Sequence, residues 1–271
     1  MTHATPGKRR FGDLGTRVIS GLVLAAIAVA AIWAGGVWAV ALVAVALCLM
    51  LWELHRMVTG DGSWRAPVPL VLCVAGVFAA VLAAGAGLVW GLACLLPGAV
   101  VAHVLAPKGG DVLAAGLIYT GGALAALLAF RFAPDGGLVI LWLVLVVAAA
   151  DIGAYFTGRS LGGPKLWPAV SPGKTWSGAA GGLAAAATAS LALALAFGWS
   201  AGPALLLGIG VAIASQGGDL LESALKRHYG VKDASALIPG HGGVMDRLDG
   251  VMGGAWFYAV WSLIGPGVNG A

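Results

Sequence analysis

Charged residues are scarce in this sequence. Only 10% of its 271 residues are Asp, Glu, Lys or Arg, whereas an average soluble domain has about 25%. Apolar residues make up 60% of the chain, and the mean hydropathy is +0.96. A soluble fold of this length has too little interior to bury so much apolar surface. The composition therefore excludes an ordinary soluble domain and favours a chain solvated by lipid.

Cysteine is also scarce. Cys48, Cys73 and Cys94 each lie inside an apolar run, with neither a paired spacing nor a neighbouring cluster of ligand residues. Disulfide frameworks and cysteine metal sites depend on such spacings. We therefore interpret the three residues as small buried hydrophobic side chains.

Apolar runs close to the ~20 residues needed to cross a bilayer recur along the whole chain. They predict an all-α fold, a polytopic transmembrane bundle of about nine helices. The first run is long and a second follows at once, so we expect a retained helix and not a cleaved signal peptide. The expected spans are 18–34, 37–55, 68–84, 87–105, 112–130, 137–157, 177–198, 202–221 and 250–266.

The basic residues are divided unevenly between the two sides of such a bundle. With a cytoplasmic N-terminus, 14 of the 15 Lys and Arg residues fall on the cytoplasmic side, and only Arg131 falls on the other. The positive-inside rule predicts this asymmetry. Because the N-terminus is basic and no transit peptide is visible, we expect a multi-pass protein of the cell inner (cytoplasmic) membrane, with its active site facing the cytoplasm. The cytoplasmic set is Lys8, Arg9, Arg10, Arg17, Arg56, Arg65, Lys108, Arg159, Lys165, Lys174, Lys226, Arg227, Lys232 and Arg247.

Most polar residues that could carry chemistry lie in the second half of the chain. We therefore divide the chain into N-terminal transmembrane helices, 1–135, and C-terminal transmembrane helices that carry the active site, 136–271. A transporter or channel is an alternative, but it would be expected to place charges deep in several helices and often to show internal repeats. Here the charges gather on one side, and no convincing repeat is visible.

Two polar islands precede residue 200. Asp151 directly follows a long apolar run; a carboxylate at membrane depth suggests function, and a helix-end Asp paired with a basic residue is the alternative. The stretch from Ser171 to Thr175 contains Gly-Lys-Thr, but it is no Walker A loop, because position 168 is proline where that motif needs glycine. A hydroxyl cap and Lys174 at a helix N-terminus still favour phosphate binding, with an ordinary capped loop as the alternative.

The third island is the richest in charge. Four of its side chains recur at i, i+3, i+4 and i+7 and share one helix face: Asp219, Glu222, Ser223 and Lys226. Asp246 and Asp249 share a second face in the same way. Two carboxylate-bearing helices joined by a glycine-rich loop can gather ligands for Mg²⁺, which prefers carboxylates together with substrate phosphates. An ion-paired loop is the alternative.

The stretch Ser223–Asp249 reads S-x-L-K-R-x4-K-D-x-S-x2-I-P-x-H-G-G-V-x-D-R-L-D. It resembles the signature of the phosphatidate cytidylyltransferases, also called CDP-diacylglycerol synthases, without departure over its 27 positions. Ser177 does depart from the family pattern, since many relatives have an acidic residue there. Upstream, the resemblance includes Gly217-Gly218-Asp219, Asp151-Ile-Gly-Ala-Tyr-Phe, Gly158-Arg159 and Ser171-Pro172-Gly173-Lys174-Thr175, with Trp52-Glu53 as a weak echo.

This resemblance implies transfer of CMP from CTP to phosphatidic acid, which gives CDP-diacylglycerol and pyrophosphate in phospholipid biosynthesis. CTP and phosphatidic acid are then the substrates, membrane lipids are partners, and no nucleic acid is expected. Mg²⁺ is the expected cofactor, as one or two divalent ions, with a second type of cation left open. A homodimer is left open too. A polyprenol kinase or a synthase acting on an ether-linked lipid is the alternative within CTP-using membrane enzymes, and the match over 223–249 argues against it.

Roles for individual residues follow from the resemblance and the charges together. The expected catalytic residues are Asp219, Lys226, Asp246 and Asp249. The expected metal ligands are Asp219, Asp246, Asp249 and Asp151. The expected substrate-binding residues are Ser171, Lys174, Thr175, Ser223, Arg227, Lys232, His241 and Arg247.

Overall fold

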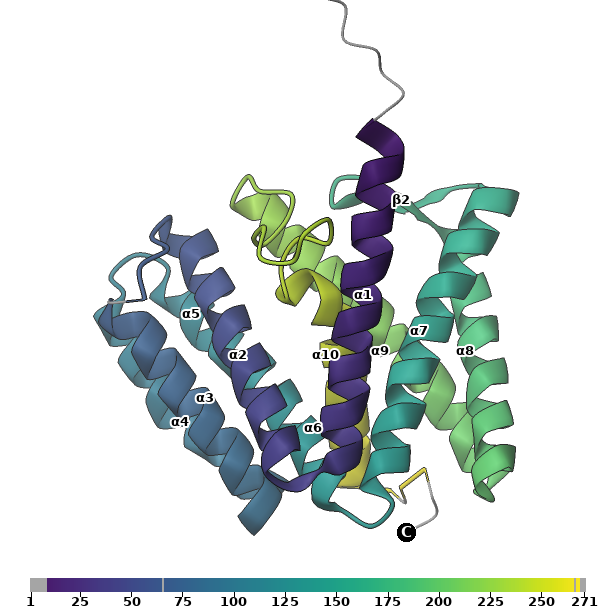
Figure 1. Cartoon of the computed structure of the whole chain (residues 1–271), viewed down its shortest axis with the longest axis horizontal. Helices are drawn as coiled ribbons and strands as arrows, with labels where there is room; N and C mark the ends of the chain where they lie inside the picture. Colours follow the sequence, from purple (N-terminus) through teal and green to yellow (C-terminus); the bar gives the residue numbers. More distant parts are fainter. Residues whose placement is uncertain (1–8, 65, 266, 269–271) are drawn as a thin grey trace, which may run out of the picture.

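The computed structural model describes residues 9–64, 66–265 and 267–268, and helices dominate this part of the chain (Figure 1). One short antiparallel hairpin, β1 (Lys165–Trp167) and β2 (Ser171–Thr175), interrupts them. The helices are α1 (Arg9–Ala34), α2 (Gly36–Thr59), α3 (Pro67–Ala86), α4 (Leu88–Leu105), α5 (Gly110–Gly116), the π-helix η1 (Leu117–Gly121), α6 (Gly122–Phe132), α7 (Gly136–Leu161), α8 (Trp176–Phe197), α9 (Ala201–His228) and α10 (Met245–Ser262).

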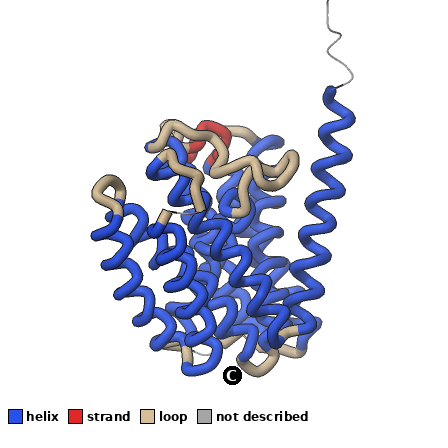
Figure 2. The backbone as a smooth tube through the Cα atoms, turned by 60° about the vertical axis from the view of Figure 1, so that its left-hand side comes forward, coloured by secondary structure: helices blue, strands red, loops and turns tan. Residues whose placement is uncertain are grey.

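The prediction of a polytopic bundle of about nine helices is confirmed for the described residues. Seven segments are long and apolar enough to cross a membrane, and one of them, Gly110–Phe132, combines α5, η1 and α6. The apolar part of α1, Ile19–Ala34, and the more polar α10 complete the bundle. Successive segments run in opposite directions, and α1 lies along one side of the bundle (Figures 1 and 2).

The expected boundaries differ from the structure mainly where polar residues continue a helix. α9 runs on to His228 and α10 starts at Met245, because side chains on one polar face can turn toward a shared site while the opposite face stays packed. The β1–β2 hairpin was not predicted, and Ser171–Thr175 forms its second strand. A strand of five residues rich in Pro, Gly and Lys has little β-propensity of its own, so the pairing with β1 decides its conformation.

Three apolar clusters form the core of the described residues; the smallest joins α2, α3 and α6 and includes Ala80 and Leu128. The two larger ones divide the bundle between them. One lies among α2–α6 and includes Leu51, Leu95 and Leu117; the other lies mainly among α6–α10 and includes Trp142 and Leu207. In the second, a buried polar chain ties three helices together: Trp142 Nε1 donates to Ser190 Oγ at 2.9 Å, and Ser190 Oγ donates to the Ala204 carbonyl at 2.6 Å. These bonds fix α7, α8 and α9 relative to one another.

One end of the bundle is polar. The hairpin, the loop between α9 and α10, and the N-terminal end of α1 all lie there (Figures 1 and 2). The basic side chains that the structure describes lie at or near this end, with the exception of Arg131 at the opposite end, where its Nε donates to the Ile32 carbonyl at 2.5 Å. Five members of the predicted cytoplasmic set lie outside the described side chains: Lys8, Arg9, Arg10, Arg17 and Arg65.

We expect the polar end to face the cytoplasm, and single cysteines at exposed positions test this. Lys108→Cys, between α4 and α5, should react with a membrane-impermeant maleimide only from the cytoplasmic side, and Asp135→Cys, between α6 and α7, only from the other side. Labelling of intact and inverted membrane vesicles measures this. The unmodified protein, whose three cysteines lie within membrane-spanning helices, supplies the background. The reverse pattern would overturn the orientation.

Candidate active site

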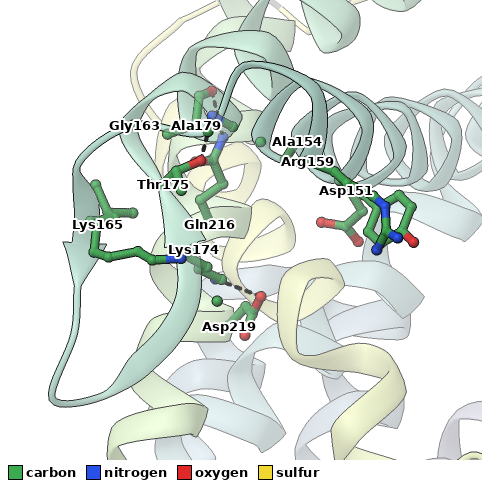
Figure 3. Close-up of a pocket in the computed structure, with 16 residues that line it drawn as sticks. Asp151, Ala154, Arg159, Gly163, Lys165, Lys174, Thr175, Ala179, Gln216 and Asp219 are labelled. Atoms are coloured by element: carbon green, nitrogen blue, oxygen red, sulfur yellow. Dashed lines mark hydrogen bonds and ion pairs between the residues drawn. The ribbon is translucent and has the colours of Figure 1, made fainter.

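A cavity of about 660 Å³ lies at the polar end, between α7, the β1–β2 hairpin, α8 and α9 (Figure 3). Its walls carry charges of both signs. Cations outnumber acids in the lining, which suits a cavity for an anionic ligand. The charged lining residues are Asp151 and Arg159 on α7, Lys165 and Lys174 on the hairpin, and Asp219 on α9.

Lys174 extends from β2 toward α9, where its Nζ lies 2.5 Å from Asp219 Oδ2 (Figure 3). The next residue, Thr175, is the N-cap of α8, and its hydroxyl accepts a hydrogen bond from Gly178 N at 3.1 Å. The expected hydroxyl cap is therefore present. Ser177 donates from its hydroxyl to the Gly162 carbonyl, which ties the start of α8 to the end of α7. Lys174 is thus held on a short, braced strand.

On its other side, α9 forms a charged junction with α10. Lys226 Nζ lies 2.6 Å from Asp246 Oδ1 and 3.2 Å from Glu222 Oε1. The second oxygen of Asp246 accepts hydrogen bonds from Gly243 N at 2.8 Å and Ala234 N at 2.9 Å. Asp246 therefore organises the loop that precedes α10 as well as pairing with Lys226.

A second acidic group at this junction has fewer partners. The Glu222 side chain is 2% exposed, and among the described residues its carboxyl contacts the Lys226 ammonium through Oε1 and the carboxyl of Asp249. Its carboxylate faces that of Asp249. The two helices approach this closely because Gly218 has no Cβ; an added Cβ would lie 2.5 Å from the Asp249 carbonyl oxygen. Two adjacent buried carboxylates with one nearby lysine leave negative charge that a cation would neutralise.

The described residues offer carboxylate ligands for a divalent cation but no complete set of protein ligands. In the described part of the chain, no three His, Cys, Asp or Glu side chains form a ready-made metal cage. The underpaired Glu222 and its neighbour Asp249 are nevertheless hard oxygen donors in a buried position. Mg²⁺ commonly uses only one or two carboxylates together with substrate phosphates and water. The donor set therefore fits Mg²⁺ that arrives with a phosphate-bearing substrate.

The loop and helix start next to this junction are held by Glu53, a fully buried carboxylate on α2. It accepts hydrogen bonds from Val244 N at 2.9 Å, Met245 N at 2.8 Å and Ser235 Oγ at 2.5 Å. No side chain from the start of α10 itself caps that helix. A carboxylate at a helix N-terminus is favoured by the unpaired N–H groups and by the helix dipole.

Several predicted substrate-binding residues lie away from both the cavity and the junction. Arg227, Lys232 and Arg247 are exposed, and Arg247 Nε donates to the His241 carbonyl at 2.9 Å. The His241 ring contacts α1 instead, with Nδ1 3.0 Å from Ser20 Oγ. Ser171 pairs with Trp167 in the hairpin. Ser223 is closer to the site, since its hydroxyl donates to Asp219 Oδ1 at 3.3 Å.

The structure also brings in residues that the sequence left unassigned. Glu222 was already on the predicted polar face of α9, so its position followed from the spacing even though no role was given to it. Glu53 had only the weak Trp52-Glu53 echo as a signal. Tyr119, whose hydroxyl lies beside Gly218, comes from the π-helix η1, and no sequence pattern predicted its approach. Lys165 was counted only as an orientation charge.

We expect Glu53→Gln to destabilise the fold. The amide loses the charge that three donors share, and its NH2 group would meet backbone N–H groups, which costs about 2 kcal/mol and lowers the apparent Tm by roughly 4–8 °C. Thermal unfolding in detergent measures this. Asp61→Asn, which alters an exposed carboxylate that accepts a local hydrogen bond from Ser63 N, is the control. Equal Tm values for both variants would contradict a stabilising role for Glu53.

Comparison with known proteins shows which family the chain belongs to. A phosphatidate cytidylyltransferase of Brucella suis is 48% identical over 144 residues, which are 52% of this chain and 53% of that protein. Proteins of the same name from Staphylococcus haemolyticus and Staphylococcus aureus are 44% and 43% identical, over 120 residues (44% of this chain and 46% of the relative) and 115 residues (42% and 44%). The chain thus spans about half the length of the curated relatives it matches. The Cytidylyltransferase family as a whole matches residues 15–264, so this chain belongs to that family.

Proposed function

We propose that this protein transfers CMP from CTP to phosphatidic acid and releases pyrophosphate, as a phosphatidate cytidylyltransferase of the cytoplasmic membrane. The observation that carries this proposal is the stretch Ser223–Asp249. Within it, Asp246 pairs with Lys226 at the junction of α9 and α10, where Glu222, just before the stretch, also contacts Lys226; a cavity lined by further cations lies beside α9. The relatives named above, which match about half of their length, support the same activity.

The reaction needs little covalent help from the protein. A phosphate oxygen of phosphatidic acid attacks the α-phosphorus of CTP, and the bond from that phosphorus to the bridging oxygen breaks, so the β- and γ-phosphates leave together as pyrophosphate. The attacking phosphate is already anionic near neutral pH and needs no general base. What it needs is in-line positioning and neutralisation of two polyanions, which pre-positioned cations supply.

The positions of the charged residues suggest which lysine binds the phosphates of which substrate. Lys226 lies at the α9–α10 junction, where it can contact the phosphates of CTP once they displace part of its pairing with Asp246 and Glu222. Lys174 lies on the cavity side of α9. Its ammonium group can contact the phosphate of phosphatidic acid once its pairing with Asp219 is broken. Asp219, with one carboxylate oxygen paired to Lys174 and the other accepting from Ser223, stands between the two regions.

We propose Asp219 and Asp249 as the Mg²⁺ ligands, with Glu222 added to the predicted set. Asp246 and Asp151 remain candidates, although Asp246 already has a lysine and two backbone N–H groups as partners. Mg²⁺, when bound, would neutralise phosphate charge and assist departure of pyrophosphate. The chain's own residues would orient the phosphates and keep the junction closed around them.

The direct test uses purified protein in detergent with phosphatidic acid, labelled CTP and Mg²⁺. Labelled CDP-lipid together with released pyrophosphate would support the proposal. A lipid alcohol assayed in parallel distinguishes the kinase alternative, since label from the γ-phosphate of CTP would then appear on the lipid. Folded protein that acts on neither lipid would overturn the proposed transferase and return transport to consideration.

Charge-neutral variants at the junction should lower turnover strongly. We expect Asp249→Asn to reduce kcat by about a hundredfold or more, because it removes a carboxylate from the place where charge is handled in the transition state. Glu222→Gln should reduce kcat to a similar extent, because we propose Glu222 as a Mg²⁺ ligand together with Asp249. Asp135→Asn, at the opposite end of the bundle, is the matched control and should keep full kcat. Near-normal kcat in both junction variants would remove them from the site.

Removal of divalent metal should abolish activity reversibly. We expect a chelator to eliminate CDP-lipid formation and added Mg²⁺ to restore it, because the buried carboxylates that face each other here can hold substrate phosphates only with a cation between them. Initial rates over a Mg²⁺ titration measure this, and Asp219→Asn should shift the half-saturating Mg²⁺ concentration upward by about tenfold. Full activity in the presence of chelator would refute the metal requirement.

A further inference from the structure

The cavity has two cationic lining residues that the reaction as outlined does not use. Arg159 stands near the end of α7 and Lys165 at the start of β1, and both side chains are exposed. Among the described residues, neither has an ion-pair partner closer than 4 Å. Lys174, by contrast, is paired with Asp219. Two unpaired cations at one rim of a cavity favour a phosphate monoester or a similar anion.

The α7 surface beside this rim is apolar. Ile152, Tyr155, Phe156 and Arg159 recur at i, i+3, i+4 and i+7, so they share one helix face. The first three side chains are 59%, 60% and 62% exposed within the bundle. Tyr155 also lines the cavity, and its ring contacts that of Phe156 edge-to-face with centroids 5.4 Å apart. The stripe is therefore continuous with the cavity and ends at its polar end in Arg159.

An apolar stripe along a helix that ends in a cation is complementary to an anionic lipid. Acyl chains pack on the apolar side chains while the phosphate meets the cation, in the way that long basic side chains meet headgroups at a membrane interface. Exposed aromatic residues mark the same level: Trp167 on β1 and Trp176 at the start of α8 are 51% and 62% exposed. Tryptophan is enriched at that depth of a bilayer. A soluble nucleotide would have no use for the stripe.

We infer that Arg159 and Lys165 hold the phosphate of the lipid substrate, whose acyl chains lie along the Ile152–Tyr155–Phe156 face of α7. This inference rests on the proposed transferase activity and adds to it a specific subsite for the lipid. The nucleotide phosphates would then belong to Lys226 and the α9–α10 junction. Lys174, which points across the cavity at Asp219, lies between the two subsites.

Steady-state kinetics in mixed detergent micelles separate the two substrates. For Arg159→Gln and Lys165→Gln we expect the KM for phosphatidic acid to rise about tenfold, the effect of one lost charge-assisted hydrogen bond, while the KM for CTP stays within about twofold. Lys108→Gln, an exposed cation at the same end of the bundle and outside the cavity, is the matched control. A rise in the KM for CTP with no change for the lipid would assign the two residues to the nucleotide and overturn the inference.

A binding experiment without turnover provides a second readout. Phosphatidic acid with a photoreactive acyl chain, added without CTP, should crosslink to α7 around Ile152 and Phe156. Unlabelled phosphatidic acid should compete, whereas glycerol 3-phosphate and phosphatidylcholine should compete poorly. The double variant Arg159→Gln/Lys165→Gln should lose the specific crosslink and retain its fold. Crosslinks spread evenly over the lipid-facing helices, or equal competition by glycerol 3-phosphate, would overturn the lipid subsite.

The wild-type protein in the same preparation keeps the two hypotheses apart. If it forms no CDP-lipid, the proposed function fails, whatever the crosslinks show. If it forms CDP-lipid and both cavity variants keep the wild-type KM for phosphatidic acid, only the lipid subsite fails.

Discussion

The buried carboxylate of Glu53 is the constraint on which the polar end of this protein depends. It comes from α2, yet its partners are the hydroxyl of Ser235 and the first N–H groups at the start of α10. These donors are buried or partly buried and would otherwise lose their hydrogen bonds with water without replacement. Gly243 packs directly on the carboxylate, where any side chain would collide with it. The loop between α9 and α10 therefore packs against the Glu53 carboxylate at Gly243.

This anchoring gives the N-terminal helices a share in the site. The proposed division of the chain at residue 135 separates Glu53 from the residues that it positions. The apolar core crosses the same boundary, since Phe130 contacts Tyr258 edge-to-face with ring centroids 4.7 Å apart. Asp246 then continues the arrangement from the first turn of α10, with two backbone N–H groups on one oxygen and Lys226 on the other. The direction of the Lys226 side chain thus depends, through the loop, on a carboxylate from α2.

The sequence predicted the bundle, its polar end and most of the charged residues that meet there. Hydropathy located the seven long apolar segments that the described residues contain, because a membrane crossing requires a long, uninterrupted apolar helix. Helical spacing placed Asp219, Glu222 and Lys226 on one side of α9. It did not show that the face divides, with Asp219 toward the cavity and Glu222 toward α10. That division depends on the close contact at Gly218, which is a tertiary feature.

The β1–β2 hairpin and the role of Glu53 also depend on tertiary contacts, so local sequence patterns did not predict them. The β1–β2 hairpin is stabilised by pairing between two short segments and by Ser177, which bonds to the end of α7. Local propensity carries little information about such pairing. The role of Glu53 depends on contacts about 180–190 residues away along the chain, as in its bonds to Ser235 and Met245. Lys232 and Arg247 were predicted to bind substrate, but both are exposed and lie away from the site. A motif does not reveal which of its charged residues face the site.

The bilayer itself explains why the cavity lies where it does. A two-stranded hairpin has unpaired backbone groups along its outer edges, and these must stay out of the hydrocarbon region. We therefore expect β1 and β2 to lie at the headgroup level or in water, with Lys165 near that level. Asp151 lies ten residues before the end of α7, which is about 15 Å deeper along the helix. The cavity lining thus places charged side chains at two levels along α7, from Lys165 at the hairpin to Asp151. Under the proposed activity, a lipid phosphate at the rim would face the nucleotide phosphates at the α9–α10 junction across Lys174 and Asp219, while the acyl chains stay in the membrane.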